Sequence, residues 1–128
     1  MIRDTETLQM LLDSLRQFVG EVLIPRENEV AETDAIPQDI VEQMQAMGLF
    51  GLTLPEAFGG LGVTMEEEVN IAFELGRTSP AFRSYIGTNN GIGSIGILLD
   101  GTEEQKQHYL PKLASGELLS SFCLTEPD

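Results

Sequence analysis

The chain has 128 residues, 41% of them hydrophobic, which is enough for one domain with a buried core. Its 21 acidic and 7 basic residues give a formal net charge of −14, which argues against nucleic acid and anionic membranes as partners because both are negatively charged. The only cysteine, Cys123, excludes an intrachain disulfide and a cysteine-rich zinc site, so we expect no bound metal.

The amino terminus has none of the features of a signal peptide. Its first four residues, MIRD, do not form an apolar core, and no run in the chain approaches about 18 consecutive apolar residues. We therefore expect a cytoplasmic protein that does not span a membrane. A protein of an organelle, with its transit peptide removed, is the alternative.

The first predicted helix begins after Asp4 or Thr5, either of which can cap it. Pro25 should bend or locally unwind this helix, because proline lacks an amide hydrogen and its ring crowds the preceding turn. We expect the helical pattern to resume through Val30. Apolar residues at helical spacing support the assignment: Leu8, Leu11, Leu12, Leu15, Phe18, Val19, Val22 and Leu23.

A second helix is predicted to begin at Pro37, since proline suits the first turn, and to end at Gly48 in a left-handed conformation. Its apolar stripe consists of Ile40, Val41, Met44 and Met47. Residues 49–63 are then expected to form a loop, because they include the turn-forming residues Pro55, Gly59, Gly60 and Gly62.

The third predicted helix opens with a capping box formed by Thr64 and Glu67. In this motif the hydroxyl and the carboxylate each satisfy a backbone amide that the first turn leaves free. One face of the helix is marked by Val69, Ala72, Phe73 and Gly76.

The fourth helix is predicted to begin at Ser79 and Pro80, which provide a cap and a first-turn proline. Each glycine inside a helix costs up to about 1 kcal/mol relative to alanine, so several of them need a close neighbour that offsets the cost. Either tight packing against another backbone or room for a substrate chain meets this requirement. The glycines are Gly87, Gly91, Gly93 and Gly96.

The fifth predicted helix opens with a second capping box, formed by Thr102 and Gln105. We expect Pro111 to break its hydrogen-bond ladder near the end, and Gly116 to terminate it. The helix contains the apolar residues Tyr109, Leu110 and Leu113. His108 on the same helix is expected at the surface.

The sequence GIGSIG at residues 91–96 satisfies the G-x-G-x-x-G pattern of dinucleotide-binding proteins. In those proteins the glycines join a buried strand to a helix whose N-terminus faces a pyrophosphate. Here residues 81–90 are too polar for a buried strand, and residues 97–101 are too short for the helix and second strand that should follow. We therefore reject an NAD-binding domain.

Residues 118–124 differ from the rest of the chain. They follow Gly116, which is predicted to end the preceding helix, and they mix apolar residues with serine. This pattern is typical of the start of a β-strand. The sequence as a whole predicts an all-α fold, a bundle of about five helices with one β-strand at the carboxyl end.

Four motifs, in order along the chain, resemble the amino-terminal third of the acyl-CoA dehydrogenase family. The first is MGLFG at residues 47–51 followed by PEAFGG at 55–60, and the second is GTEEQK at 101–106. The third is YLPKLASGE at 109–117, and the fourth is LTEP at 124–127. The resemblance extends over nearly the whole chain, and the order and spacing of the motifs make it specific.

The resemblance implies a domain organisation and an activity. Residues 1–117 would form the helical N-terminal domain, and residues 118–128 would begin a central β-barrel. The family oxidises acyl-CoA thioesters to 2,3-enoyl-CoA with FAD: a carboxylate removes the α-proton while the β-hydride moves to flavin. Electrons pass to an electron-transferring flavoprotein, and most members are homotetramers.

The same resemblance places the catalytic glutamate in the carboxy-terminal helical bundle. We therefore expect no catalytic residue in these 128 residues, which alone should be inactive. Phe122, Leu124 and Thr125 are expected to contact the flavin, Leu124 through its main chain and Thr125 through its amide and hydroxyl. An ordinary strand residue is the alternative for Thr125, and we expect Cys123 to be buried filler.

In the family the fourth helix lines the acyl pocket. If that helix forms here, Ser84 or Tyr85, Thr88 or Asn89, and Ile92 face the acyl chain, because they lie one turn apart. Helix core is the alternative for these positions.

Arg83 suggests a more specific role. The segment Phe82-Arg83-Ser84 is similar to one in glutaryl-CoA dehydrogenases, where the arginine addresses the distal carboxylate of the substrate. The planar guanidinium suits this task because it binds a carboxylate through two hydrogen bonds. A solvated or ion-paired arginine with a structural role is the alternative.

Two alternative functions remain from the sequence. A non-catalytic helical interaction module would use the glycine-rich helix to pack against a partner. An acyl-CoA oxidase of the same superfamily would share this domain, because the residues that control oxygen reactivity are not in it.

Overall fold

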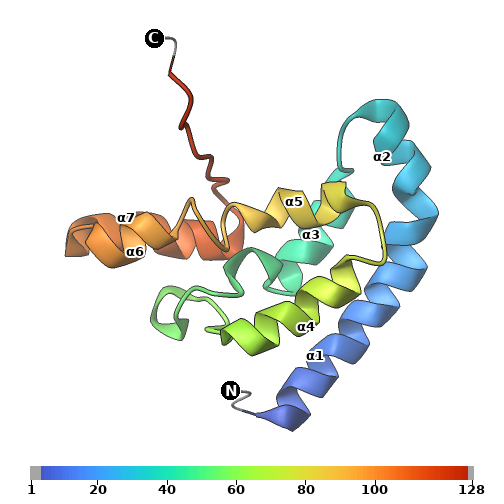
Figure 1. Cartoon of the computed structure of the whole chain (residues 1–128), viewed down its shortest axis with the longest axis horizontal. Coiled ribbons are helices and arrows are strands. Elements are labelled where there is room, and N and C mark those ends of the chain that lie inside the picture. The colour runs from blue at the N-terminus through green and yellow to red at the C-terminus, as the bar shows by residue number, and fades with distance from the viewer. Residues whose placement is uncertain (1–3, 127–128) are drawn as a thin grey trace. The chain divides into compact units, whose positions relative to one another are not determined.

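The computed structural model describes residues 4–126, as helices joined by turns and followed by an extended segment (Figure 1). These residues divide into two compact units, each made of two stretches of the chain. Unit 1 comprises residues 4–46 and 63–85, and unit 2 comprises residues 47–62 and 86–126. The described part contains no β-strand, which confirms the all-α prediction.

The first helix and the break at Pro25 follow the prediction. Helix α1 (Thr5–Phe18) is capped by Asp4, whose carboxylate accepts hydrogen bonds from the amides of Glu6 and Thr7 at 3.0 and 3.2 Å. Ahead of Pro25 the ladder changes to a π-helix, η1 (Val19–Leu23), and around the proline to a 3-10 helix, η2 (Ile24–Arg26). The α-helix resumes as α2 (Glu27–Thr33). The missing amide hydrogen of Pro25 explains the local unwinding.

Helix α3 (Gln38–Ala46) and helix α4 (Met65–Leu75) complete most of unit 1. The capping box of Thr64 and Glu67 is present, with the Thr64 amide donating to the Glu67 carboxylate at 2.7 Å. Helix α1 packs against α4. The fully buried large side chains of this unit include Leu15, Leu23, Ile40, Met44, Ile71, Leu75 and Phe82.

The face that Val69, Ala72, Phe73 and Gly76 mark on the third predicted helix is not its buried face. In α4 the buried residues are Glu67, Ile71 and Leu75, whereas Val69 is 46% and Phe73 75% exposed. Two residues along a helix correspond to a rotation of about 200°, so Val69 and Phe73 lie opposite the buried face. Glu67 of the capping box lies on the same buried face as Ile71 and Leu75.

Unit 2 is built around helix α7 (Glu103–Ser115), which packs against α6 (Ile95–Asp100) and two short 3-10 helices, η3 (Leu49–Gly51) and η4 (Glu56–Phe58). Its core consists of Leu54, Leu110, Leu113 and Ala114, with Phe58, Ile97 and Leu98 packed against them. A β-carbon on Gly51 would lie 2.9 Å from the Ala114 β-carbon, so only glycine allows η3 this close to α7.

Helix α7 continues past Pro111, so the expected break in its hydrogen-bond ladder is limited to the bond that the proline cannot donate. The proline lies inside the helix, which ends at Gly116 in the left-handed conformation, with φ 76°. Leu110, Leu113 and Ala114 are buried on both sides of the proline. Their packing keeps the last turn helical although one backbone hydrogen bond is missing.

The fourth predicted helix is split. Helix α5 (Pro80–Gly87) ends at its first glycine, residues 88–94 form turns, and α6 then begins. The glycines of residues 91–96 lie in and after these turns, and the described residues contain no βαβ unit, as expected from the rejected NAD-binding domain. The low helix propensity of glycine explains the interruption.

The β-strand expected over residues 118–124 is not formed in the described part of the chain. Residues 119–126 run as an extended trace without strand pairing (Figure 1). A strand requires a neighbour for its backbone hydrogen bonds, and the described residues provide none. Pro127 and Asp128, which belong to the same predicted segment, lie outside the described residues.

Candidate functional site

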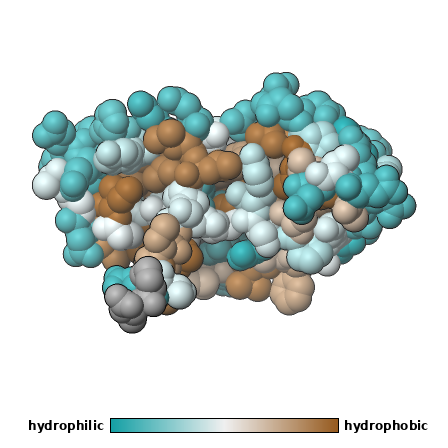
Figure 2. Space-filling model, turned by 90° about the horizontal axis from the view of Figure 1, so that it is seen from above, coloured by the Kyte–Doolittle hydropathy of each residue, from teal (hydrophilic) through white to brown (hydrophobic). Residues whose placement is uncertain are grey.

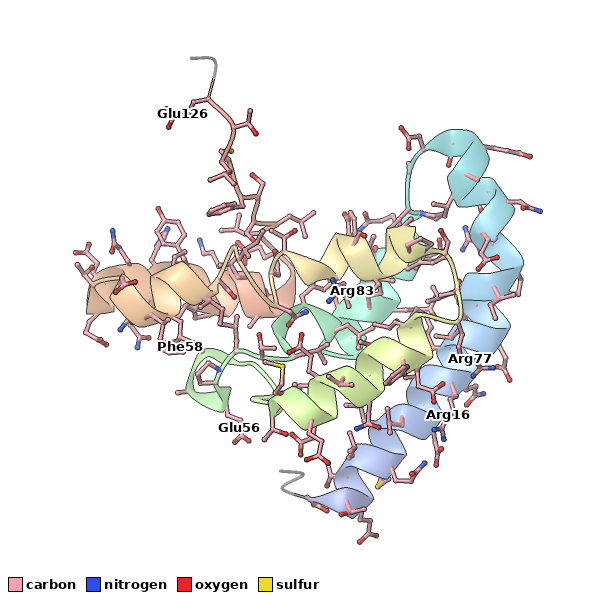
Figure 3. The ribbon with its side chains drawn as sticks, viewed as in Figure 1. Arg16, Glu56, Phe58, Arg77, Arg83 and Glu126 are labelled. Atoms are coloured by element: carbon pink, nitrogen blue, oxygen red, sulfur yellow. The ribbon has the colours of Figure 1, made fainter. Side chains whose placement is uncertain are left out.

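The extended segment at the end of unit 2 contains the three residues expected to contact a flavin. Phe122 is 56% and Leu124 is 73% exposed, and Thr125 is also exposed. Within residues 4–126, neither Leu124 nor Thr125 makes a hydrogen bond. Two apolar side chains, a hydroxyl and unpaired backbone groups are therefore available to a ligand. Figure 3 labels Glu126 at the end of this segment.

The base of the segment is fixed by the side chain of Asn89, which is only 1% exposed. Its amide nitrogen Nδ2 donates hydrogen bonds to the carbonyls of Leu113 and Leu118, at 2.9 and 2.8 Å. Its oxygen Oδ1 accepts from the amide and the hydroxyl of Ser120, at 2.8 and 2.9 Å. One side chain thus connects the turns after α5, the end of α7 and the start of the extended segment.

Gly93 lies against the same place. A β-carbon at Gly93 would collide with the side chain of Ser120, so the turn passes directly beside the extended segment. The Leu118 amide also donates to the Lys112 carbonyl at 3.1 Å. The close neighbour that the glycine-rich sequence required is, at Gly93, another part of unit 2.

The side chain of the adjacent Asn90 also holds backbone groups together, at another place in unit 2. Its Nδ2 donates to the carbonyls of Leu49 and Ile86, at 2.6 and 3.1 Å, and its Oδ1 accepts from the Thr53 amide at 3.3 Å. The Thr53 hydroxyl in turn donates to the Asn90 carbonyl at 2.6 Å. Sequence analysis assigned no role to Asn90, although two consecutive asparagines before a glycine are typical of a turn held by side-chain hydrogen bonds.

The residues predicted to contact substrate do not form one helix face. Arg83 and Ser84 lie on α5 in unit 1, whereas Thr88, Asn89 and Ile92 lie in the turns of unit 2. Thr88 is half-buried, Asn89 is buried and Ile92 is 65% exposed. The one-turn spacing rule applies only as far as Gly87, where the helix ends.

An open surface pocket of about 510 Å³ lies next to α5 in unit 1. Ser84 and Tyr85, two of the predicted acyl-facing residues, line it together with Val30, Asp34, Ala35, Ile36 and Ala81. Arg83 is exposed and forms no ion pair with any residue among 4–126 (Figure 3). The role of Arg83 toward a substrate stays a prediction.

Ion pairs connect the helices of unit 1. The carboxylate of Glu74 on α4 accepts from Arg16 on α1 at 2.7 Å and from Arg77 at 3.2 Å (Figure 3). Burial alone would raise the pKa of Glu74, but hydrogen bonds from Arg16 and Arg77 outweigh it, so the pKa lies below its ordinary value. These pairs belong to the scaffold, because each cation already has its partner.

Several remaining expectations concern single side chains and surfaces. His108 is exposed as expected, but Cys123 is also exposed and is not buried filler, because the extended segment leaves its neighbours unpacked. Residues 4–126 contain no metal-binding group of three ligands and no helix long and apolar enough to cross a membrane. On the face that Figure 2 shows, hydrophobic side chains are exposed among hydrophilic ones.

Comparisons with known proteins give the family. The family model for the acyl-CoA dehydrogenase N-terminal domain matches residues 5–117. The chain is 42% identical to (2S)-methylsuccinyl-CoA dehydrogenase of Cereibacter sphaeroides, over 96% of this chain and 22% of that protein. It therefore spans about a fifth of the length of that relative.

Solved structures that are similar to this chain support the same family. One described as the electron transferring flavoprotein of Acidaminococcus fermentans matches with a TM-score of 0.84 and 30% identity, over 99% of this chain and 34% of that one. An acyl-CoA dehydrogenase complexed with FAD from Bacillus anthracis matches with a TM-score of 0.81 and 31% identity, over 98% and 22%. Because the family model covers most of its length, the chain belongs to the acyl-CoA dehydrogenase family, with the fold of the N-terminal domain.

Proposed function

We propose that the chain is the front part of an FAD-dependent acyl-CoA dehydrogenase that oxidises an acyl-CoA thioester to the 2,3-enoyl-CoA. Residues 1–117 would be its N-terminal helical domain and residues 118–128 the start of its central β-barrel. Besides family membership, one observation supports the proposal: Phe122, Leu124 and Thr125 are exposed on a segment whose base is anchored and whose own hydrogen-bonding groups are unused.

These three residues fit a flavin. Phe122 and Leu124 offer apolar surface to a planar ring system, and the free amide and hydroxyl of Thr125 are hydrogen-bond donors for its polar edge. When bound, FAD supplies the acceptor for a hydride from the substrate. Donors fixed beside the ring stabilise the negative charge that this transfer brings, provided that the protein holds them in place. The solved relative from Bacillus anthracis is complexed with FAD.

For the substrate, we propose that Arg83 and Ser84 on α5 contact the acyl chain, whereas a substrate contact by Thr88, Asn89 or Ile92 stays a prediction. Ser84 lines a pocket, and Arg83 has no ionic partner in the described chain, so its guanidinium is available to an anion. A terminal carboxylate on the acyl chain would match that guanidinium. The relative from Cereibacter sphaeroides is named for such a substrate, methylsuccinyl-CoA, the thioester of a dicarboxylic acid.

Replacing Arg83 in the full-length protein tests this substrate class. In the Arg83→Ala variant we expect kcat/KM for glutaryl-CoA to fall by about 30-fold or more, because a charge-assisted bidentate contact is lost, and kcat/KM for butyryl-CoA to stay within about twofold. Arg83→Lys should be intermediate, and Arg77→Ala is the control for loss of one surface charge. Equal losses for both thioesters would refute the role of Arg83.

The remaining parts of the proposal concern the whole protein. We place the catalytic base in the carboxy-terminal domain, so the 128 residues alone should have no activity. We propose an electron-transferring flavoprotein as the electron acceptor and a homotetramer as the assembly; one structural relative is itself described as such a flavoprotein. A cytoplasmic location stays a prediction.

The test of the function is an assay of the full-length protein with a panel of acyl-CoA thioesters. We expect 2,3-enoyl-CoA to form when an electron-transferring flavoprotein or a dye is the acceptor. Turnover with oxygen and release of hydrogen peroxide would indicate the oxidase instead. Failure to oxidise any thioester while the protein holds no flavin would favour the non-catalytic interaction module.

A further inference from the structure

We infer that Asn89 is a positioning residue for the cofactor segment, which we define as residues 122–125. The inference rests on the proposed function, because it concerns the residues that would contact the flavin. In this role Asn89 touches no reacting atom. It fixes the place and the direction in which the chain leaves unit 2, and so determines where Phe122, Leu124 and Thr125 begin.

Asn89 uses its full hydrogen-bonding capacity. An asparagine side chain has two N–H donors and one oxygen that accepts twice, and all four hydrogen bonds are formed here, to three residues: Leu113, Leu118 and Ser120. At 1% exposure the amide has no water to replace a missing partner. The side chain therefore holds Leu118 and Ser120 in one arrangement relative to the end of α7.

The restraints stop abruptly after Ser120. Leu118 is held by the Lys112 carbonyl and by Asn89, and Ser120 is held by Asn89 and confined by Gly93. Beyond Ser120, within the described residues, the only polar contact is a long one between the Ser121 hydroxyl and the Cys123 sulfur, at 3.9 Å. An extended chain advances about 3.3 Å per residue, so Phe122 begins roughly 7 Å from the last fixed point. Ser120 is therefore the last anchored residue before the cofactor segment.

Asn90 provides a matched control within the same unit. It is also buried, at 7% exposure, and its side chain also bonds two carbonyls and one amide. Its partners lie at Leu49, Thr53 and Ile86, and none of them is in the cofactor segment. Loss of Asn90 should therefore destabilise unit 2 without displacing residues 122–125.

The experiment compares Asn89→Ala and Asn90→Ala in the full-length protein. After FAD has been removed, each variant is titrated with FAD to give the dissociation constant, and hydrogen exchange is followed in the peptide that contains Ser120. We expect both variants to lose thermal stability. Only Asn89→Ala should bind FAD about tenfold more weakly and exchange the Ser120 peptide faster, because the segment must now be ordered on binding.

Ser120→Ala is a gentler second variant, in case Asn89→Ala does not fold. It removes one of the four hydrogen bonds and should weaken FAD binding by about threefold with little loss of stability. Equal FAD affinities for Asn89→Ala and Asn90→Ala, or an unchanged affinity for Ser120→Ala, would overturn the positioning role. If instead the wild-type protein binds no FAD, it is the proposed function that fails, and exchange at Ser120 still shows whether Asn89 anchors the segment.

Discussion

The two units are stabilised by different kinds of contact between segments far apart in the sequence. In unit 1, polar side chains connect distant segments: Arg16 on α1 pairs with Glu74 on α4, Arg26 pairs with Asp39, and Glu27 accepts from Thr78. In unit 2, the buried amides of Asn89 and Asn90 hold irregular backbone, and glycines allow close approaches. Helices satisfy their own backbone groups, whereas turns need partners from elsewhere in the chain.

This difference has consequences for tolerance to mutation. A surface ion pair contributes little, because water solvates either charge when its partner is removed. A buried amide that bonds backbone carbonyls cannot be replaced in this way, because its removal leaves those carbonyls without partners. The segment proposed to contact the cofactor belongs to the less tolerant unit. We therefore expect mutations in unit 2 to affect both stability and cofactor binding.

The largest effect should come from Gly60→Ala in unit 2. The added β-carbon would collide with the Leu54 carbonyl and lie 2.7 Å from the Gly51 carbonyl oxygen, and both are backbone groups that cannot rotate away. We expect a loss of more than about 3 kcal/mol in the free energy of unfolding, measured by urea denaturation. Gly96→Ala is the control: its β-carbon meets nothing within 4 Å and it lies in α6, so it should stabilise by up to about 1 kcal/mol. Similar losses for both would contradict the account.

A smaller effect is expected for single hydrogen-bonding side chains, and it should differ between the units. Asn90→Ala should cost about 2 to 3 kcal/mol, because it leaves the carbonyl of Leu49 without this donor in a buried site. Thr78→Val in unit 1 removes one hydrogen bond, to Glu27 at 2.8 Å, and should cost about 1 kcal/mol, because the carboxylate regains water. The two unfolding midpoints, measured side by side, test the comparison. A larger loss for Thr78→Val would reverse it.

The smallest expected effect is on the loss of folding stability at low pH. Three carboxyl groups with a lowered pKa, Asp4, Glu29 and Glu74, lie in unit 1. A lowered folded-state pKa gives stability that is present above the ordinary value, 4.5 for Glu74, and is lost as the pH falls through the folded value. Glu74→Gln should therefore reduce the loss of stability between about pH 7 and about pH 3, as followed by urea denaturation, because the amide does not titrate. An unchanged acid dependence would show that Glu74 contributes none of it.

In both units, local features were more predictable from the sequence than packing between distant segments. Local signals gave the cap at Asp4, the capping boxes at Thr64 and Thr102, and the helix ends at Gly48 and Gly116, because each depends on residues within one turn. The buried side of α4, the passage of α7 through its proline and the split after Gly87 depend on packing with distant segments.

In the candidate site, too, contacts between distant residues could not be predicted from the sequence. The resemblance to a family named Phe122, Leu124 and Thr125, and the structure places them on an exposed segment. The contact between Asn89 and Ser120 joins residues 31 positions apart, and no periodicity in the sequence signals it. Asn89 was instead grouped with the acyl-facing positions, since its place one turn after Tyr85 fitted a helix that ends before reaching it.

The most direct test of the account is the flavin content of the full-length protein. We expect it to purify with one FAD per chain and to lose its visible flavin absorbance when an acyl-CoA thioester is added without oxygen. Both results follow if residues 122–125 form part of a flavin site in an acyl-CoA dehydrogenase. A colourless protein that takes up no FAD on titration would contradict the central claim.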